Sequence, residues 1–207
     1  MTRRALLPLL VAVCLQGCKT HPPEPSPTSS AIPTPRKTTT PVSVPTPQLQ
    51  PFQEKLIQGA RKTLGDTYDD GYYGGGPPPA GRGACTDVIY SAFLSAGINL
   101  RDRVEEDVAI APSGYPNLGD RNINYRRAPN LIVWFRRHSE SLPLDSDFEP
   151  GDVVFWSLLN DGVADHVGLV SVGEDVVIHN MGPSCREEPV LRAYTILGHF
   201  RKSPIQP

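Results

Sequence analysis

Residues 83–97, Gly-Ala-Cys-Thr-Asp-Val-Ile-Tyr-Ser-Ala-Phe-Leu-Ser-Ala-Gly, are the stretch that decides the fold of this chain. Their apolar side chains recur at helical spacing and form one face: Val88, Ile89, Ala92, Phe93 and Ala96. The glycine- and proline-rich run before them, residues 74–81, excludes a helix or strand interior, and Gly97 supplies a stop signal. The pattern therefore predicts a helix with Cys85 in its first turn.

Cys85 has two interpretations at this position. A helix N-terminus presents the positive end of the helix dipole and unpaired backbone N–H groups, and both favour the nucleophilic thiolate. The alternative is a small buried residue on a core helix. The stretch by itself favours neither interpretation, so the rest of the chain has to decide between them.

The first 17 residues have the composition of a secretory signal peptide. Arginines are followed by an apolar run over residues 5–15, which is too short to span a bilayer. The run ends Leu15-Gln16-Gly17-Cys18, which resembles a bacterial lipobox; the alternative is a plain signal with a chance cysteine. We expect Cys18 to carry a lipid, and Lys19, which is not the aspartate of inner-membrane retention, favours the outer membrane facing the periplasm.

Residues 18–51 are rich in proline, threonine and serine and contain almost no large apolar side chains. Such a segment cannot bury enough surface to offset its ordering entropy, so we expect a disordered, polyproline-like tether. At about 3.1 Å per residue, its reach when fully extended is on the order of 100 Å. The folded part is then expected over residues 52–207, which is one domain by length.

Charge and cysteine content limit the function classes. A net charge of −2 gives no electrostatic case for nucleic-acid binding or for an anionic membrane surface, so membrane contact is expected from the lipid. Two thiols remain in the folded part, Cys85 and Cys185, and an exported domain could join them in a disulfide. A disulfide would block Cys85, so it excludes a nucleophilic role.

The pattern of the folded part changes from helical to strand-like along the chain. Helical spacing is found over residues 52–64, an acidic run over 102–107 is a short helix or its edge, and 131–135 is a helix or a strand. Strand-like runs follow at residues 152–156, 166–172, 175–179 and 193–201. Helices followed by a strand meander predict an α+β domain.

Cys85 needs a base, and the folded part offers four histidines: His138, His166, His179 and His199. Gly173-Glu174 fits a two-residue hairpin turn, and that register places Gly168 opposite His179. His166 then lies on the same face as His179, one diagonal step away, where side chains can meet. A three-residue loop would place the two imidazoles on opposite faces.

These residue types allow an ordered relay. His166 would accept the proton of Cys85, and His179 would hold His166 in the right tautomer, as in acyl-transfer hydrolases. The Cys85 backbone N–H would help to stabilise an oxyanion. A zinc site built from Cys85, His166 and His179 has acceptable ligand types, but its spacing matches no compact zinc pattern.

The motifs together resemble the NlpC and CHAP papain-like cysteine peptidases of bacterial cell walls. The resemblance runs through Cys85, residues 151–156, residues 166–170 and residues 177–179. Within that superfamily the chain is similar to the bacterial domain of unknown function twelve-eighty-seven, over roughly residues 64–201. The matching runs are residues 83–88, 120–127, 129–131, 178–180 and 198–201.

The resemblance implies a papain-like fold, with N-terminal helices packed on an antiparallel sheet. It also implies that Cys85 is the nucleophile, His166 the base and His179 the third polar residue. Tyr73, twelve residues before Cys85, would help to form the oxyanion site, with Tyr68 and Tyr72 as competitors for that role.

Other residues of the matching runs are candidates for substrate contact. Asp87 supports the helix N-terminus or touches a substrate amine, and Asn122, Arg126 and Arg127 are candidates at the substrate side. An arginine fork suits a stem-peptide carboxylate, although salt-bridged or solvated arginines are the commoner case. Asn124-Tyr125 replaces the Asp-His pair that is usual in the family, which puts specificity or activity in question.

The sequence thus predicts a lipid-anchored, monomeric cysteine hydrolase that cleaves amide bonds in peptidoglycan and needs no metal or organic cofactor. One alternative is an acyltransferase or lipid-amide hydrolase with the same triad. Another is an inert wall-binding lipoprotein. We expect His199 to be structural, His138 to lie on the surface and Cys185 to have no catalytic role.

Overall fold

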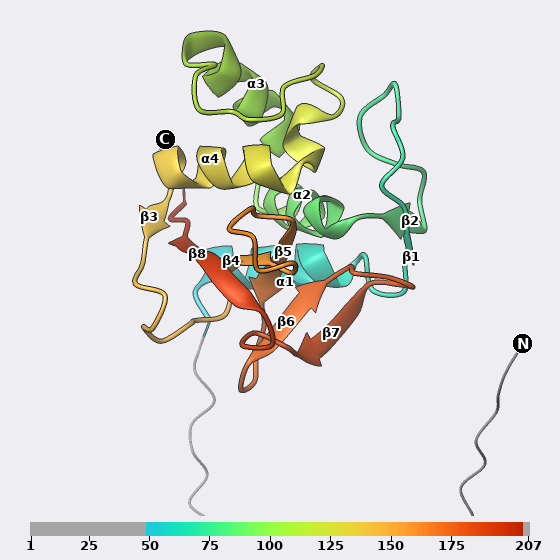
Figure 1. The fold of residues 1–207 in the computed structure, drawn as a ribbon. Helices are drawn as coiled ribbons and strands as arrows, with labels where there is room; N and C mark the ends of the chain where they lie inside the picture. Colours follow the sequence, from blue (N-terminus) through green and yellow to red (C-terminus); the bar gives the residue numbers. More distant parts are fainter. Residues whose placement is uncertain (1–48, 205–207) are drawn as a thin grey trace, which may run out of the picture. The chain divides into compact units, whose positions relative to one another are not determined.

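Helices come first along the chain and a strand meander follows, as the α+β prediction requires (Figure 1). The computed structural model describes residues 49–204, so the predicted signal peptide, Cys18 and most of the predicted tether lie outside it. The helices are α1 (Pro51–Arg61), α2 (Cys85–Ser95), α3 (Leu100–Ile110), the 3₁₀ turn η1 (Asn124–Arg126) and α4 (Ala128–His138). The strands are β1 (Thr67–Tyr68), β2 (Arg82–Gly83), β3 (Glu140–Ser141), β4 (Val153–Ser157), β5 (His166–Val170), β6 (Val176–His179), β7 (Arg186–Pro189) and β8 (Thr195–Arg201).

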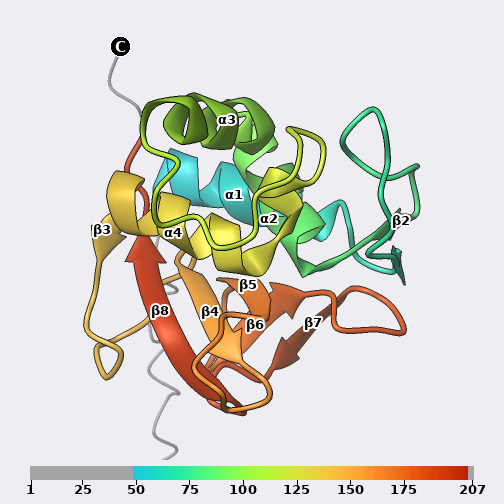
Figure 2. The ribbon, with the colours of Figure 1, turned by 45° about the horizontal axis from the view of Figure 1, so that its top comes forward.

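Within residues 49–204 the main sheet is antiparallel and has the order β3-β8-β4-β5-β6-β7. Strands β4 to β7 form a meander, and β8 returns to lie between β3 and β4. The helices lie together on one face of this sheet (Figure 2). β1 and β2 form a separate parallel pair directly before α2.

The helical layer agrees with the sequence patterns except at the element ends. α1 begins at Pro51, whose missing N–H costs nothing at the first helical position, and it ends three residues before the predicted Leu64. The acidic run 102–107 lies inside an eleven-residue helix, α3. Residues 131–135, left open between helix and strand, are part of α4, which buries the apolar side chains of one face.

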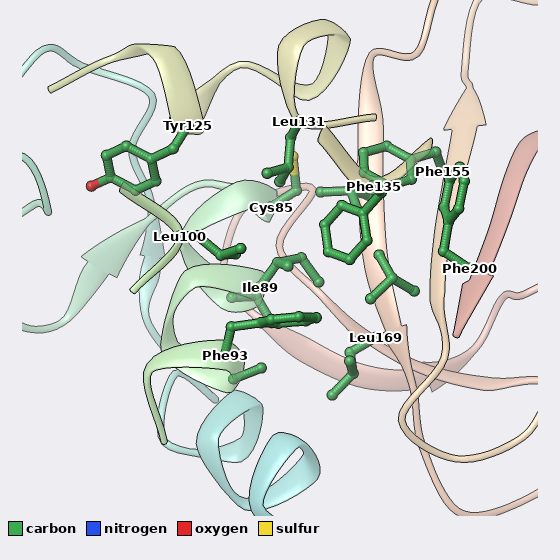
Figure 3. Packing of buried hydrophobic residues seen from close by; sticks show 14 of the residues in the cluster. Cys85, Ile89, Phe93, Leu100, Tyr125, Leu131, Phe135, Phe155, Leu169 and Phe200 are labelled. Atoms are coloured by element: carbon green, nitrogen blue, oxygen red, sulfur yellow. The ribbon is translucent and has the colours of Figure 1, made fainter. Parts of the chain in front are cut away.

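The core lies between the helices and the sheet (Figure 3). The Phe135 ring of α4 is at its centre, with ring centroids 5.3 Å from Phe93, 5.6 Å from Phe155 and 5.8 Å from Phe200. Cys85 belongs to the same cluster. Aromatic pairs at such distances add to the stabilisation from buried area, so the nucleophile candidate stands on a rigid element.

The other face of the sheet carries a smaller apolar cluster: Val154, Trp156, Val170, Val177 and Leu191. His166 is four residues from Val170 on β5, and His179 is two residues from Val177 on β6. Side chains an even number of residues apart point to the same face of a sheet, so both histidines belong to the face of this cluster. Among the helices of residues 49–204, none combines the length and apolar character of a membrane span.

Candidate active site

Cys85 is the first residue of α2, as the sequence predicted. Ala84 precedes it in an extended conformation, and its backbone N–H donates to the Asp87 carboxylate at 2.8 Å. That bond satisfies one of the N–H groups that a helix N-terminus leaves without a partner. Cys85 is 8% exposed, which leaves only a narrow approach to the sulfur.

The surroundings of Cys85 shift the pKa of its thiol in opposite directions. Burial raises the pKa of the Cys85 thiol to about 12, and the nearby Asp87 carboxylate adds to the increase. The backbone N–H groups of Val167, Thr86 and Cys85 itself act in the opposite direction and do not offset the burial. Of the two interpretations of Cys85, the helix N-terminus favours a thiolate, but burial of the sulfur opposes it and has the larger influence on the pKa.

The β5–β6 register brings His166 and His179 together, as predicted. Leu169 faces Ile178 and Val170 faces Val177, and extending this register places Gly168 opposite His179. The His166 Nε2 and His179 Nδ1 atoms are 2.9 Å apart. The reversal itself is wider than a two-residue turn, because β5 ends at Val170 and β6 begins at Val176.

The sulfur of Cys85 lies close to the start of β5, at Val167, the residue that follows His166. The backbone N–H of Val167 favours the thiolate through a hydrogen bond. The side chains of Cys85 and His166 are not hydrogen-bonded to one another in this structure. Hydrogen bonds of unliganded catalytic sites are often long and tighten with substrate, so this geometry is compatible with a base at His166.

Trp156 forms a wall of the histidine pair, a role that the sequence analysis did not assign. Its ring stacks on His166 with centroids 5.5 Å apart, and its Nε1 donates to the Leu191 carbonyl at 2.9 Å. A Cβ on Gly168 would lie 3.0 Å from the Trp156 ring and 2.5 Å from Val177. Glycine at residue 168 therefore allows the tryptophan to cover His166.

Glu188 is a second residue that the sequence analysis missed. Its Oε1 lies 3.1 Å from His179 Nε2, on the side of the ring away from His166. Glu188 is on β7, a strand with the sequence Arg-Glu-Glu-Pro, which has none of the β-branched residues that indicate strands. Because β7 was not predicted as a strand, Glu188 could not be placed next to His179 from the sequence.

The imidazoles are neutral around neutral pH. Burial lowers the pKa of His166 to about 3, and the neighbouring His179 lowers it further. The pKa of His179 is also lowered, again chiefly by burial, although Glu188 acts to raise it. The pair at rest is thus a neutral thiol and a neutral base rather than a thiolate–imidazolium pair.

Of the tyrosines, Tyr68 is the one that interacts with Cys85. It pairs with Gly83 in the short β1–β2 sheet, two residues before Cys85. Burial raises the pKa of Tyr68, and charge on Asp70 and on Cys85 adds to the increase. Tyr73, preferred from its spacing, instead donates its hydroxyl to Asp69 at 2.7 Å.

Asp87 and Arg126 form a buried ion pair. The guanidinium meets the carboxylate in a two-pronged contact, with Nε–Oδ1 and Nη2–Oδ2 distances of 2.9 Å. Arg126 also donates to the carbonyl groups of Gly71 and Asp69, and its side chain is 1% exposed. The pair ties α2 to η1, and Arg126 also holds the loop at residues 69–71. Asp87 in addition lines the cavity beside the start of α2.

Asn122 and Arg127 lie in the loop region on the helical side. Asn122 accepts a hydrogen bond from Arg101 and donates to the Tyr72 hydroxyl at 3.3 Å. Arg127 donates to the Asn117 carbonyl. Both side chains brace loops, and neither is joined by a hydrogen bond to Cys85, His166 or His179.

Asn124 and Tyr125, the departure from the family pattern, are buried within the helical layer. Asn124 accepts from the Gly119 N–H at 2.7 Å and donates to Glu105 at 2.7 Å. The Tyr125 ring packs 5.0 Å from the ring of Tyr90. Their contacts are structural, so this departure leaves the histidine pair untouched.

Both cysteines of the described region are free and buried, so the disulfide that the composition allowed is absent from residues 49–204. Cys185 lies 3.3 Å from the Thr63 hydroxyl. In the same region no group of three His, Cys, Asp or Glu side chains is arranged to hold a metal ion. A cavity of about 140 Å³ opens beside the start of α2, lined by Gly83, Ala84, Asn180 and the Pro77–Ala80 loop among others.

The chain belongs to the family described as Domain of unknown function (DUF1287), whose model matches residues 57–202. The uncharacterized protein YijF of Escherichia coli (strain K12) is 40% identical over 165 residues, covering 70% of this chain and 80% of YijF. The family membership that the motifs indicated is therefore confirmed.

Solved structures with a similar arrangement come from NlpC/P60 proteins. NlpC2 of Trichomonas vaginalis has a TM-score of 0.46 at 17% identity, covering 73% of this chain and 46% of that one. The peptidoglycan hydrolase RipB of Mycobacterium tuberculosis has 0.44 at 16%, covering 72% and 64%. RipD of the same organism, a non-catalytic NlpC/p60 domain protein, has 0.44 at 16%, covering 73% and 97%. Such likeness does not decide the reaction, which has to be argued from the site.

Proposed function

We propose that this protein is a cysteine hydrolase that cleaves amide bonds in the stem peptides of peptidoglycan. The observation that carries the proposal is the 2.9 Å contact between His166 and His179, on a strand whose Val167 N–H interacts with the sulfur of Cys85 at the start of α2. Nucleophile, base and orienting group are the three parts that acyl transfer by a thiol requires. The substrate class is taken from the resemblance of the sequence motifs.

The reaction starts from the neutral pair. As Cys85 Sγ attacks the amide carbonyl carbon, its proton moves to His166, and the carbonyl becomes an oxyanion. The Cys85 backbone N–H, at the first position of α2, interacts with its own sulfur in the resting state and would turn to that oxyanion as the sulfur bonds to carbon. Collapse breaks the C–N bond, and the imidazolium of His166 gives the proton to the leaving amine.

The second half of the reaction releases the acyl group. Water attacks the thioester carbonyl and gives a proton to His166. The C–S bond breaks, the carboxylic acid leaves, and the sulfur regains its proton from His166. The high pKa of the resting thiol means that attack and proton transfer occur together, because a free thiolate is not stored in the site.

The test is digestion of purified peptidoglycan with the full chain, beside its Cys85→Ala variant, followed by mass spectrometry of the products. New muropeptides that vanish with Cys85→Ala would support the proposal, and their masses would name the bond. A folded, reduced protein that releases nothing would contradict it for this substrate. Release of acyl groups from lipid amides by the same protein would favour the related acyl-transfer activity.

A second candidate function is binding without cleavage. The observation that favours it is the neutral, 8% exposed thiol without a hydrogen bond to His166. This candidate predicts that wild-type protein and Cys85→Ala sediment with insoluble peptidoglycan to the same extent and that neither changes its muropeptide profile. A difference in the profile would contradict it.

The cell-envelope location forms part of the same proposal. Cys18 carries the lipid, residues 18–51 act as the tether, and the protein faces the periplasm from the outer membrane. Labelled palmitate should enter the wild-type chain and not Cys18→Ser, and the variant should leave the membrane fraction. Label in Cys18→Ser, or a variant that stays in membranes, would contradict the anchor.

A further inference from the structure

Beyond the pair of histidines, the hydrogen-bonded series continues to a carboxylate. Glu188 Oε1 is 3.1 Å from His179 Nε2, and His179 Nδ1 is 2.9 Å from His166 Nε2. Every ring nitrogen of the pair therefore has a partner except His166 Nδ1, which makes no hydrogen bond within residues 49–204. Which atom donates in each hydrogen bond of this series follows from the chemistry of Glu188, the residue at its end.

An ionised carboxylate only accepts hydrogen bonds. His179 must therefore donate its Nε2–H to Glu188, and a neutral imidazole that carries a proton on Nε2 has an unprotonated Nδ1. His166 must then donate its Nε2–H to His179 Nδ1, which leaves the His166 Nδ1 lone pair free. Each ring carries a single proton near neutral pH because burial disfavours the imidazolium of both histidines.

We propose that Glu188 is the positioning residue that fixes the tautomers of both histidines and so makes His166 Nδ1 the base for Cys85. The inference rests on the proposed function, which gives that base a reaction to perform. Glu188 touches neither the sulfur nor a substrate; it acts through two rings. A reversed series, with His166 carrying its proton on Nδ1, would present a donor where the reaction needs an acceptor.

The surroundings of Glu188 suit this role. Its side chain is 28% exposed, whereas that of His179 is 3% exposed, so the charge lies at the edge of the site and keeps contact with water. The positively charged neighbour on the same strand is Arg186, which is opposite His179 in the β6–β7 register and 3.4 Å from Glu188 Oε1, while Glu187 is paired with Arg61. Arg186 thus places a positive charge next to the carboxylate that accepts from His179.

The same series stabilises the charge that forms during the reaction. When His166 Nδ1 accepts the thiol proton, the ring becomes an imidazolium whose Nε2–H points to His179. His179 is held in place by the negative Glu188, so the new charge faces an oriented acceptor rather than a rotating ring. Stacking of Trp156 on His166 restricts the plane in which this transfer takes place.

The test uses the full chain with ¹⁵N-labelled histidine, because ring nitrogen shifts and couplings in NMR spectra report which nitrogen carries the proton. In the wild type we expect both His166 and His179 as the Nε2–H tautomer at pH 7. Glu188→Gln should populate the other tautomer of both rings, since an amide offers a donor as well as an acceptor. The matched control is Glu187→Gln, which removes the same charge one residue away, where Glu187 contacts Arg61 and Ser171.

A kinetic measurement completes the test. Glu188→Gln should lower kcat for peptidoglycan cleavage at least tenfold with little change in KM, and by less than the roughly 10⁴-fold of a triad whose base loses its direct orienting carboxylate. Glu187→Gln should leave kcat unchanged. Wild-type rings in the Nδ1–H tautomer, or tautomers and kcat that do not respond to Glu188→Gln, would overturn the inference.

The outcomes also separate this inference from the proposed function. The tautomers are read on the protein itself, without a substrate, and the wild-type spectrum alone decides the first expectation even if Glu188→Gln does not fold. If the tautomers follow the expectation and no muropeptide is released, Glu188 keeps its positioning role and the peptidoglycan substrate is wrong.

Discussion

Two buried histidine networks lie in the same sheet, and they differ in how many ring nitrogens have a partner within residues 49–204. His199 of β8 has its Nε2 2.8 Å from the Asp152 carboxylate and its Nδ1 3.2 Å from the Pro143 carbonyl. Arg201 donates to the same Asp152 at 2.7 Å. Both nitrogens of His199 have protein partners, and the Ser146 hydroxyl also lies 3.3 Å from Nδ1, whereas His166 Nδ1 makes no hydrogen bond within residues 49–204.

The comparison of the two networks shows that burial alone does not distinguish the roles of these histidines. They differ in the number of ring nitrogens that have a hydrogen-bond partner. The Asp152 network joins the residue before β4 to β8 and reaches the surface through Arg201, which suits a structural role for the motifs at residues 151–152 and 198–201. The His166 network leaves His166 Nδ1 without a hydrogen bond within residues 49–204 at one end and reaches water through Glu188 at the other. Four experiments test or sharpen this contrast.

The largest effect is expected on catalysis. His166→Gln should lower kcat by about 10⁴-fold or more, because the thiol loses its base. His199→Gln removes a histidine of equal burial and should leave kcat of the folded protein within a factor of a few. Muropeptide release by both variants measures this. Equal losses in the two would show that the contrast between the networks is wrong.

For the free energy of unfolding, we expect the larger effect in the His199 network and the smaller one in the His166 network. Asp152→Asn leaves His199 and Arg201 without their buried negative partner, and breaking such a group costs about 3–5 kcal/mol of unfolding free energy. Glu188→Gln removes a carboxylate that is 28% exposed and should cost less than about 1 kcal/mol. Urea unfolding of both variants beside the wild type gives these values. A smaller loss for Asp152→Asn than for Glu188→Gln would contradict the assignment.

Gly168 and Gly198 allow a comparison of the two networks, because each glycine is in close contact with a neighbouring side chain. A Cβ at Gly168 would lie 2.5 Å from Val177, and one at Gly198 would lie 2.5 Å from the Phe200 ring. Alanine at either site should cost about 1–3 kcal/mol through overpacking. Only Gly168→Ala should also lower kcat, because it displaces the Trp156 ring that covers His166. Thermal unfolding with kinetics on the folded fraction separates the two effects.

The smallest effect is a pH dependence of stability. The folded-state pKa of His166, about 3, lies below the roughly 6.5 of an unfolded chain, so the unfolded state binds the proton between these values. Stability is therefore full above pH 6.5 and is lost as the pH falls toward 3. The linkage predicts a loss of about 1 kcal/mol between pH 6.5 and 5.5 that His166→Gln lacks. Denaturant unfolding at both pH values checks this.

Local patterns carried much of the prediction. The apolar face of residues 83–97 predicted a helix with Cys85 in its first turn, and the β-branched runs predicted β4, β5, β6 and β8, because both depend on side-chain period alone. The β5–β6 register followed from the turn signal at Gly173, although the reversal is longer than predicted. The histidine contact was therefore predictable.

Other features depend on contacts between distant segments. Tyr73 was preferred over Tyr68 by counting residues, but the glycine-rich loop changes that spacing, and strand pairing places Tyr68 near Cys85 instead. Arg126 was considered for substrate binding, but it is enclosed by Asp87 and two carbonyl groups. Neither result is visible in the local sequence. The catalytic roles of Cys85, His166 and His179 stay predictions.

The sequence by itself determined the family, the residue types of the candidate site and several helices and longer strands, though not β7, since periodicity, turn signals and motifs are local properties of the chain. Only the tertiary structure decided the charge state of Cys85, the hydrogen bonds of the Asp152 network and the presence of Glu188 behind His179. The physical reason is that desolvation and hydrogen-bond partners depend on which distant segments surround a group. A helix N-terminus favours a thiolate, and the burial of that same helix start in the core outweighs it.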